Sequence, residues 1–443
     1  MLKRHCSSRN LLKTLMKRRS LLAAALAIAA SRGAEIAFAR RAASQTPSTS
    51  GTSLQVALVG DCVFTQGLLR DDPKLQHVLP FLRDADVTIA NFEGTLADPG
   101  SWAALIDPGG VPVCGGLNVR GDATVPADLV WLGIDMVGTA NNHAMDWGPD
   151  GLRATTRKLG AAGIQHCGTG EDLTQARKPA YYNSKEGRIA LISCASTYWP
   201  GALASLGNPA VPGRPGVNPV RFHAVGSVAD TSAIETAATQ VDPRDLVDIC
   251  ATIKEARAEA DVVLVSCHSH EDGGDRTIPP RFLSELAHGC VDAGAQAFFS
   301  HGPHILRGIE IYRDAPILYG LGAFIFRARD LRQLPEELYE NCGLTRRDPL
   351  ELFARTSRDW DNDVAFWESL IAQLEFRNGR VAAVNLIPTH TRHDSPETYG
   401  MPELATGAHG NLILQRMRQL CDAFGTRLQI RAGVAKLHMA EHS

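Results

Sequence analysis

The chain has 443 residues, 44% of them hydrophobic, which is ordinary for a globular protein and enough to bury one large core. The formal net charge is −3, but without a predicted leader of residues 1–39 the remaining 404 residues carry 37 basic and 47 acidic side chains. Such an acidic surface argues against nucleic acid as a partner, and a polyanionic substrate would need a local basic patch or a metal ion to be held.

The first residues predict an export signal of the twin-arginine type. Residues 17–20 read Lys-Arg-Arg-Ser, residues 21–30 are apolar, and residues 37–39 read Ala-Phe-Ala, a small-residue cleavage candidate. The apolar stretch is too short for a comfortable membrane span, and the alternative interpretation is a basic amphipathic helix. We expect a periplasmic or extracellular protein with no stable membrane span after cleavage. Residues 40–53, rich in Ser, Thr and Ala, are expected to form a disordered linker.

Five apolar runs predict strands, and each run leads to polar residues at its end. The runs cover residues 54–59, 87–90, 136–139, 262–266 and 297–300. In the same order, they lead to Asp61, Glu93, Asn142 with His143, His268, and His301 with His304. Ligands of open α/β sheets gather outside the carboxyl ends of the strands, so these distant residues can converge on one site.

The residue types at these strand ends are those that divalent ions prefer. Carboxylate, amide and imidazole groups suit zinc, manganese or iron, and nothing resembles a thiolate site. Taken singly, Asp61 or Glu93 could cap a helix and His268 could be a hydrogen-bonded core histidine. Those alternatives do not explain why such residues recur at strand ends. The sequence therefore predicts a site for one or two divalent ions (Mn, Zn or Fe), with the ligands Asp61, Glu93, Asn142, His268, His304 and His301.

Helical patterns lie between the strands, over residues 151–159, 246–260 and 281–293. This alternation predicts an α/β fold of layered sheets with helices outside. A Pro- and Gly-rich stretch at residues 200–219 is expected to form a long loop near the rim of the site. The charged residues 327–362 are expected to form a mixed helix-loop insertion.

The cysteine pattern predicts few disulfides. Ten cysteines are present, Cys6 belongs to the predicted leader, and the other nine show no paired short spacings. We expect mostly buried free thiols with at most one or two bridges. Cys62 and Cys267 flank proposed ligands, and we interpret both as core residues.

The ordered motifs resemble the poly-γ-glutamate capsule synthesis proteins of the CapA family, which are similar in fold to calcineurin-like metallophosphoesterases. The residues that carry the resemblance are Gly60-Asp61, Asn91-Phe92-Glu93, Ala140-Asn141-Asn142-His143 with Asp146 and Gly148, His268 with Glu271, and His301-Gly302-Pro303-His304. Residues 308–324 are similar to the family segment after the histidine pair, and residues 412–426 to its closing helix and strand. The resemblance covers residues 54–432 and implies a metallophosphoesterase-like α/β sandwich. It leaves insertions near 200–245 and 327–362 and a tail at 433–443.

The chain also departs from the family pattern. Ala323 stands where the family segment Ser-Leu-Gly-Asn-Phe has a polar residue, and Ser300 stands where a glycine is common. Phosphoesterases place a histidine two residues after the first aspartate, where this chain has Val63. One of two metal positions could therefore lack a ligand. The pattern His268-Ser269-His270 leaves open which of its two imidazoles points into the site.

The predicted ligands imply hydrolytic chemistry. A divalent ion lowers the pKa of bound water and stabilises charge on a phosphoryl or acyl oxygen. We expect Glu93 to bridge if two ions bind, and His143 to act as general acid. His270, Glu271 and Arg307 are candidates for substrate binding, although for Arg307 a solvated surface residue is the favoured interpretation.

Three functions are compatible with these predictions. The first is an exported, CapA-like, metal-dependent hydrolase of capsule, poly-γ-glutamate or cell-envelope polymers, whose substrate is an anionic polymer or a phosphoester. The second is a non-catalytic protein that binds the polymer within a capsule synthesis or export assembly. The third, a secreted phosphodiesterase or nucleotidase, follows only from analogy of fold. His143 and the ligand set favour an enzyme, whereas Val63 favours the binding role.

Overall fold

The computed structural model describes residues 53–101, 118–225, 239–329, 339–340, 343–344 and 348–439. The predicted leader, and the predicted linker apart from residue 53, lie outside the described residues. Among the residues described, no helix combines the length and the apolar composition that crossing a membrane requires.

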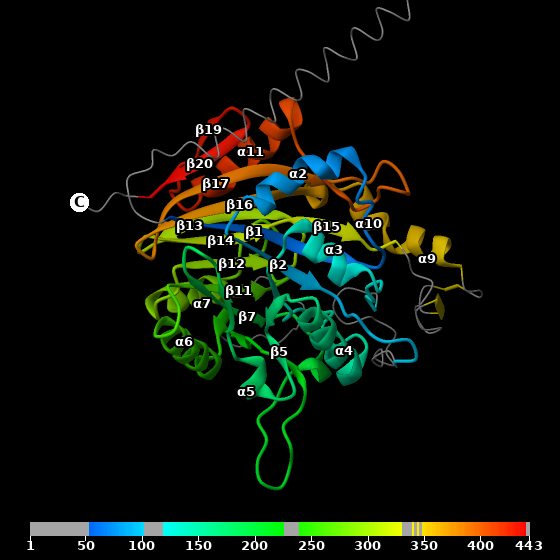
Figure 1. The fold of residues 1–443 in the computed structure, drawn as a ribbon, viewed down its shortest axis with the longest axis vertical. Coiled ribbons are helices and arrows are strands. Elements are labelled where there is room, and N and C mark those ends of the chain that lie inside the picture. Colours follow the sequence, from blue (N-terminus) through cyan, green and yellow to red (C-terminus); the bar gives the residue numbers. More distant parts are fainter. Residues whose placement is uncertain are drawn as a thin grey trace, which may run out of the picture.

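The largest sheet has ten strands, and it joins an antiparallel half to a parallel half (Figure 1). Its order is β19 (Gln429–Arg431), β20 (Val434–His438), β17 (Arg380–Thr391), β16 (Glu368–Arg377), β1 (Ser53–Phe64), β2 (Val87–Glu93), β3 (Met136–Gly138) and β4 (Gln165–Cys167). Two further strands join it, β15 (Ala323–Arg327) beside β1 and β18 (Pro402–Leu404) beside β17. Because β20 pairs with β17, the folded domain continues beyond residue 432, where the expected tail was placed.

A second sheet has six strands and lies against the first (Figure 1). Its order is β13 (Leu306–Tyr312), β14 (Ala315–Leu321), β12 (Ala297–His301), β11 (Val262–His268), β7 (Arg188–Ala195) and β6 (Ala180–Asn183). The remaining described strands form two short two-stranded sheets, β5 (Thr169–Gly170) with β8 (Gly216–Val217) and β9 (Phe222–Ala224) with β10 (Thr239–Val241). Leu58 and Ile89 of the large sheet pack with Phe299 of the small sheet in one buried apolar cluster.

Helices pack against both sheets. The helices are α2 (Pro73–Arg83), α3 (Val125–Leu132), α4 (Gly148–Ala161), α5 (Leu173–Ala176), α6 (Pro243–Arg257), α7 (Arg281–Asp292), α9 (Pro349–Thr356), α10 (Arg358–Asp361) and α11 (Gly407–Asp422). Buried residues of α2 and α3 form one cluster with the large sheet, and those of α6 and α7 form another with the small sheet. The predicted layered α/β sandwich with helices outside is confirmed.

The five predicted strands and three predicted helices are all present. Strand β1 is longer than predicted, because it continues through an irregularity at Asp61 to Phe64, where it pairs with β15. The stretch at residues 200–219 is more ordered than a simple loop, since it contains a 3₁₀ helix (Pro200–Ala202) and β8. Its residues 206–212 are exposed and belong to the segment that projects from the molecule (Figure 1).

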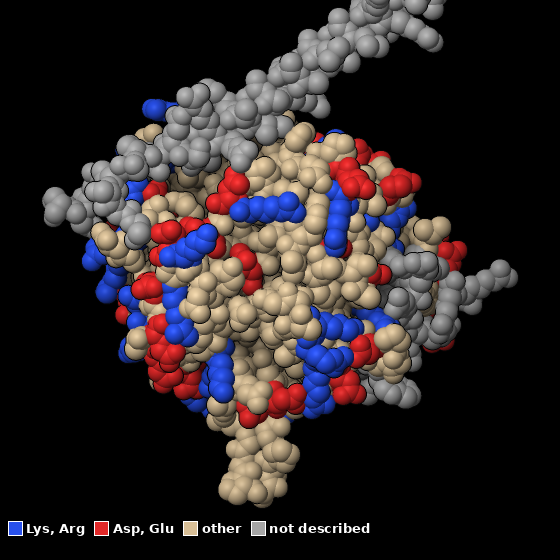
Figure 2. Space-filling view, viewed as in Figure 1, with Lys and Arg blue, Asp and Glu red and all other residues tan. Residues whose placement is uncertain are grey.

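The seven cysteines that the structure describes are all free thiols, and six of them are buried. Cys62 and Cys267 are fully buried in the apolar clusters outside the two sheets. Their interpretation as core residues is therefore confirmed. On the face shown in Figure 2, basic and acidic side chains alternate, and the described residues there form no extended basic area.

Candidate metal centre

The predicted ligands meet where the carboxyl ends of strands from both sheets lie together. Asp61 comes from β1 and Glu93 from β2 of the large sheet, whereas His268 and His301 end β11 and β12 of the small sheet. All four side chains are at most 1% exposed. The central geometric expectation, that residues some 240 positions apart converge, is met, because His304 Nδ1 lies 2.9 Å from Asp61 Oδ2.

The carboxylate of Asp61 joins the two sheets. Within the large sheet, Asn91 Nδ2 donates to Asp61 Oδ1 at 2.8 Å. From the other sheet's loop, the backbone N–H of Gly302 donates to Oδ2 at 3.0 Å, and His301 Nδ1 lies 3.4 Å from Oδ1. Burial alone would raise the pKa of Asp61, but the hydrogen bonds and charges of His301 and His304 outweigh it and hold that pKa well below its ordinary value.

The carboxylate of Glu93 has the opposite environment. Neither of its buried oxygens accepts a hydrogen bond from the described residues. Instead, Oε1 faces three imidazoles, and it lies 3.9 Å from His143 Nε2, 3.9 Å from His268 Nε2 and 3.8 Å from His304 Nε2. Burial, followed by the charge of Asp61, raises the pKa of Glu93 well above its ordinary value. A buried carboxylate surrounded by ring nitrogens is the environment that a bound cation would satisfy.

Three imidazoles of the small sheet also point their nitrogens at one another. His268 Nδ1 lies 3.1 Å from His301 Nδ1, and His268 Nε2 lies 3.1 Å from His270 Nε2. Burial lowers the pKa of His268 and lowers that of His270 to about 3, and the charges of neighbouring histidines contribute to both shifts. Neutral imidazole is the form that ligates metal, so the burial of these rings favours ligation.

Taken together, these side chains form three overlapping sets of ligands. The atoms of each set all lie within 4.8 Å of one another, and the sets are Asp61, His268 and His301; Glu93, His268 and His270; and Asp61, Glu93 and His304. Carboxylate and imidazole donors with an unsatisfied buried carboxylate fit a divalent transition metal. The arrangement accommodates His270 as well as His268, which the sequence could not decide. Asn142 is 1% exposed and lies beside His143 in the chain, and its role as a ligand stays a prediction.

His143 is held by a carboxylate behind it. Its Nδ1 lies 2.7 Å from Asp146 Oδ2, which also accepts the N–H of Val119 at 2.6 Å. The backbone N–H of His143 donates to Asn141 Oδ1 at 3.1 Å. An Nδ1–H bonded to Asp146 leaves Nε2 directed at the centre, where Glu93 lies. This geometry suits a group that transfers a proton at Nε2.

Glu271 holds the loop that carries His270. Its Oε2 accepts from Ser196 Oγ at 2.7 Å and from Ser269 Oγ at 2.9 Å, and its Oε1 accepts from Thr197 Oγ1 at 2.8 Å. The same Thr197 hydroxyl accepts the backbone N–H of His270 at 2.8 Å. Three hydroxyl groups thus donate to the carboxylate of Glu271, which we expected to contact substrate. In the structure this carboxylate positions the loop that carries His270.

Arg307 lies inside the protein. Its side chain is fully buried, so the interpretation of a solvated surface arginine is wrong. Nε donates to the carbonyl of Arg276 at 2.8 Å, and Nη2 donates to the carbonyl of Glu271 at 2.9 Å. Burial lowers the pKa of Arg307 to about 10. The guanidinium therefore braces the loop of residues 271–276, and its contact with a substrate stays a prediction.

The loop that delivers His304 has an unusual backbone. His304 has a φ of 56°, a left-handed value that residues with a side chain rarely adopt. Gly302 has a φ of 123°, and a Cβ there would lie 3.0 Å from the backbone of Ser269. The close approach of these two loops brings His304 and His270 to the same centre, with ring centroids 5.6 Å apart.

Two residues that depart from the family pattern, Val63 and Ala323, are both buried in the structure. Val63 is 3% exposed and belongs to an apolar cluster that includes Phe326. Ala323 is in register with Asp61 across the β1–β15 pair. The positions that would carry extra polar ligands are therefore apolar and lie next to the metal centre.

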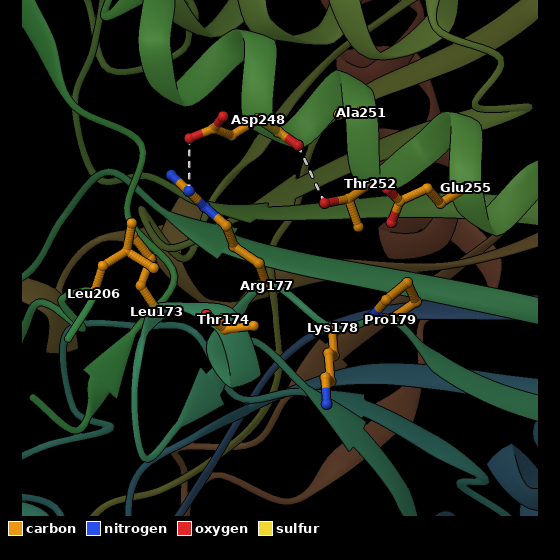
Figure 3. Close-up of a pocket in the computed structure, with 10 residues that line it drawn as sticks. All are labelled: Leu173, Thr174, Arg177, Lys178, Pro179, Leu206, Asp248, Ala251, Thr252 and Glu255. Carbon is orange, nitrogen blue, oxygen red and sulfur yellow. Dashed lines mark hydrogen bonds and ion pairs between the residues drawn. The ribbon is translucent and has the colours of Figure 1, made fainter. Parts of the chain in front are cut away.

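Four further polar residues contact the predicted site residues, and only Ser266 lies outside the motifs that carry the family resemblance. Asn91 bonds Asp61, Ser266 Oγ lies 2.8 Å from His301 Nε2, Asp146 bonds His143, and Asn141 Nδ2 donates to the carbonyl of Phe92 at 2.8 Å. Asn91 and Ser266 lie two residues before the predicted ligands Glu93 and His268, Asn141 lies next to Asn142, and Asp146 lies three residues after His143. Nearness in the sequence was the available signal. A separate cavity of about 340 Å³ between α5 and α6 contains none of the site residues, and its Arg177 is paired with Asp248 (Figure 3).

The two-sheet α/β sandwich, with carboxylates and imidazoles gathered at its strand ends, has a metallophosphoesterase-like fold. Residues 55–328 match the family model described as "Bacterial capsule synthesis protein PGA_cap", and the chain belongs to this family.

Individual relatives extend the match. The chain is 30% identical over 432 residues to an uncharacterized protein, y4uA, of Sinorhizobium fredii, and the match covers 86% of this chain and 92% of the relative. It is 33% identical to a probable polyglutamine synthesis accessory protein of Mycobacterium tuberculosis, over 54% of each chain. It is 25% identical to the PGA biosynthesis protein CapA of Bacillus subtilis, over 68% of this chain and 71% of that protein.

Proposed function

We propose that this protein is an exported, metal-dependent hydrolase of capsule or cell-envelope polymer metabolism. Its substrate would be an anionic polymer of the poly-γ-glutamate kind or a phosphoester. The observation that carries the proposal is Glu93, a buried carboxylate that accepts no hydrogen bond within the described part of the chain and faces three imidazole nitrogens. The names of the capsule and polyglutamine synthesis relatives support the substrate class, and residues 17–39 support export.

The site residues would have two different roles in the proposed reaction, metal binding and proton transfer. A divalent ion bound here would supply the positive charge that stabilises a developing oxyanion and acidifies a water ligand. Asp61, Glu93, His268 and His304 would hold that ion, with His270 and His301 completing the sets. His143 would hold a proton at Nε2 for the leaving oxygen, because Asp146 fixes its Nδ1.

The test compares two variants with the wild-type protein, purified without a histidine tag. Elemental analysis measures the metal, and hydrolysis is measured on phosphoesters and on γ-glutamyl polymers with Mn, Zn or Fe added. We expect Glu93→Ala to lose both metal and turnover, and His143→Ala to keep the metal and lose turnover. A normally folded wild type that binds no metal would refute the proposal, and unchanged rates in His143→Ala would refute the role of His143.

A second function has a specific observation in its favour. Val63, where phosphoesterases have a histidine, is buried among apolar residues and offers no ligand. We propose as the alternative a metal-containing protein that binds the polymer within a synthesis or export assembly without turnover. Tight metal together with polymer binding, and no hydrolysis of either substrate class, would support this alternative over the enzyme.

A further inference from the structure

A second cavity rich in histidine lies at the edge of the large sheet, where α2, β17, β18 and the first turn of α11 meet. Its volume is about 240 Å³, and its polar lining consists of Lys74, His77, His390, Glu403, Thr406 and His409. None of these residues belongs to the metal centre described above. Three imidazoles and one carboxylate around a single cavity are a donor set that divalent transition metals use.

Strand pairing fixes the inner part of this cavity. His390 of β17 and Glu403 of β18 are register partners in the antiparallel pair, and His390 Nε2 lies 3.9 Å from Glu403 Oε2. The ring of His409 lies 4.7 Å from that of His390, centroid to centroid, at an interplanar angle of 63°. A half-turn of the exposed His409 ring exchanges its nitrogens and carbons, so a nitrogen can face the same point. His77, exposed on α2, lies at the open side.

The chemistry of these imidazoles favours a cation over an anion. Nδ1 of His390 is buried and has no hydrogen-bond partner among the described residues. Nε2 of the same ring lies 3.9 Å from Glu403 Oε2, and imidazole nitrogen with carboxylate oxygen is a donor pair that divalent transition metals use, whereas a carboxylate repels an anion.

We infer that His390, His409 and Glu403 form a second, peripheral site for a divalent transition metal such as Zn²⁺, with His77 within reach at the open side. The site shares no residue with the metal centre, and the inference does not rest on the proposed hydrolysis. In the structure, Lys74 Nζ lies 2.7 Å from Glu403 Oε2. The Lys74 side chain is 47% exposed, so it can turn into solvent. Arg392 Nε lies 3.9 Å from the same oxygen, so lysine, arginine and metal compete for one carboxylate.

The experiment is a Zn²⁺ titration of the full chain near neutral pH, without an affinity tag, against a chromophoric chelator and after the metal centre is loaded. The wild type is expected to take up one further equivalent. His409→Ala and Glu403→Gln should each lower the affinity for this additional Zn²⁺ by more than about tenfold and leave the metal content of the metal centre unchanged. Lys74→Met should raise the affinity for the additional Zn²⁺ severalfold, because the competing ammonium group is gone. His223→Ala, which removes an exposed histidine outside the cavity, should change nothing.

The inference fails if the wild type binds no further equivalent, or if His409→Ala and Glu403→Gln bind it as tightly as the wild type does. A Lys74→Met protein that binds Zn²⁺ no tighter would overturn the competition at Glu403. Because His409 is exposed, its replacement should leave the unfolding midpoint of the metal-free protein unchanged. If that variant no longer binds the additional Zn²⁺, the loss is then due to the missing ligand and not to unfolding.

Discussion

The two sheets contribute different chemistry to the metal centre. The large sheet supplies the carboxylates of Asp61 and Glu93, and the small sheet supplies the imidazoles of His268 and His301. The two carboxylates also differ, because donors from both sheets satisfy Asp61, whereas Glu93 receives no hydrogen bond from the described residues. Asp61 therefore connects the two sheets without a metal ion, whereas Glu93 lacks such donors and a bound cation would supply the missing interaction. Four variants test this contrast.

Replacing Asp61 by Ala is expected to have the largest effect. The variant leaves Asn91 Nδ2 and the N–H of Gly302 without their acceptor in a buried place. We expect the metal-free protein to lose about 3–5 kcal/mol of unfolding free energy, and the metal to be lost as well. Urea unfolding of the metal-free protein measures the first effect. An unchanged midpoint would show that Asp61 does not join the sheets.

Replacing Asp146 by Asn tests how the large sheet positions His143. The Asn side chain no longer holds His143 in one tautomer, so turnover should fall on the order of 100-fold. Metal content should stay the same, and the pH profile of the remaining activity should shift. Asp135→Asn is the matched control, because it removes a carboxylate that accepts from the N–H of Thr88, away from the site. Equal losses in both variants would contradict the role of Asp146.

Replacing Glu93 by Gln should act in the opposite direction to Asp61→Ala on the metal-free protein. The neutral amide replaces a buried carboxyl group whose charged form has no donor among the described residues, so unfolding free energy should rise by about 1–3 kcal/mol while metal affinity falls. Glu375→Gln is the control, because Glu375 is a buried glutamate that accepts from Arg377 Nε at 2.7 Å. That variant should be destabilised. A loss of stability in Glu93→Gln would mean that the carboxylate is satisfied without a cation.

The smallest effect is expected in the small sheet, at Ser266→Ala. The hydroxyl lies 2.8 Å from His301 Nε2 and orients that ring, so the metal affinity should fall about tenfold. Ser193 is in register with Ser266 on the next strand, and its hydroxyl has no hydrogen bond among the described residues. Ser193→Ala should therefore leave the affinity unchanged. Similar metal affinities in the two variants would show that Ser266 does not orient His301 for metal binding.

The sequence predicts the strand ends well because a buried parallel strand leaves a local apolar signal, and its last residues must be polar to face a site. It does not reveal how the strands divide between two sheets, since apolar runs such as 87–90 and 262–266 look alike. The bond from Asn91 to Asp61 depends on the register of β1 and β2, which no local pattern specifies. The pair of His390 and Glu403 depends in the same way on a three-residue strand.

Buried arginine shows the same limit. Arg307 is charged, and a charged side chain in isolation predicts exposure. Its burial follows from two carbonyls of the loop 271–276, which only the folded chain brings to its guanidinium. Prediction from the sequence therefore works for groups placed by their own strand and fails for groups placed by a distant loop.

Anomalous diffraction from crystals grown with Zn²⁺ or Mn²⁺ tests the central claim most directly. The account predicts a metal peak at coordination distance, about 2.0–2.3 Å, from a carboxylate oxygen of Glu93 and from Nε2 of His304. Crystals of the folded protein with the metal bound only elsewhere, and with Glu93 still facing the three imidazoles, would contradict it.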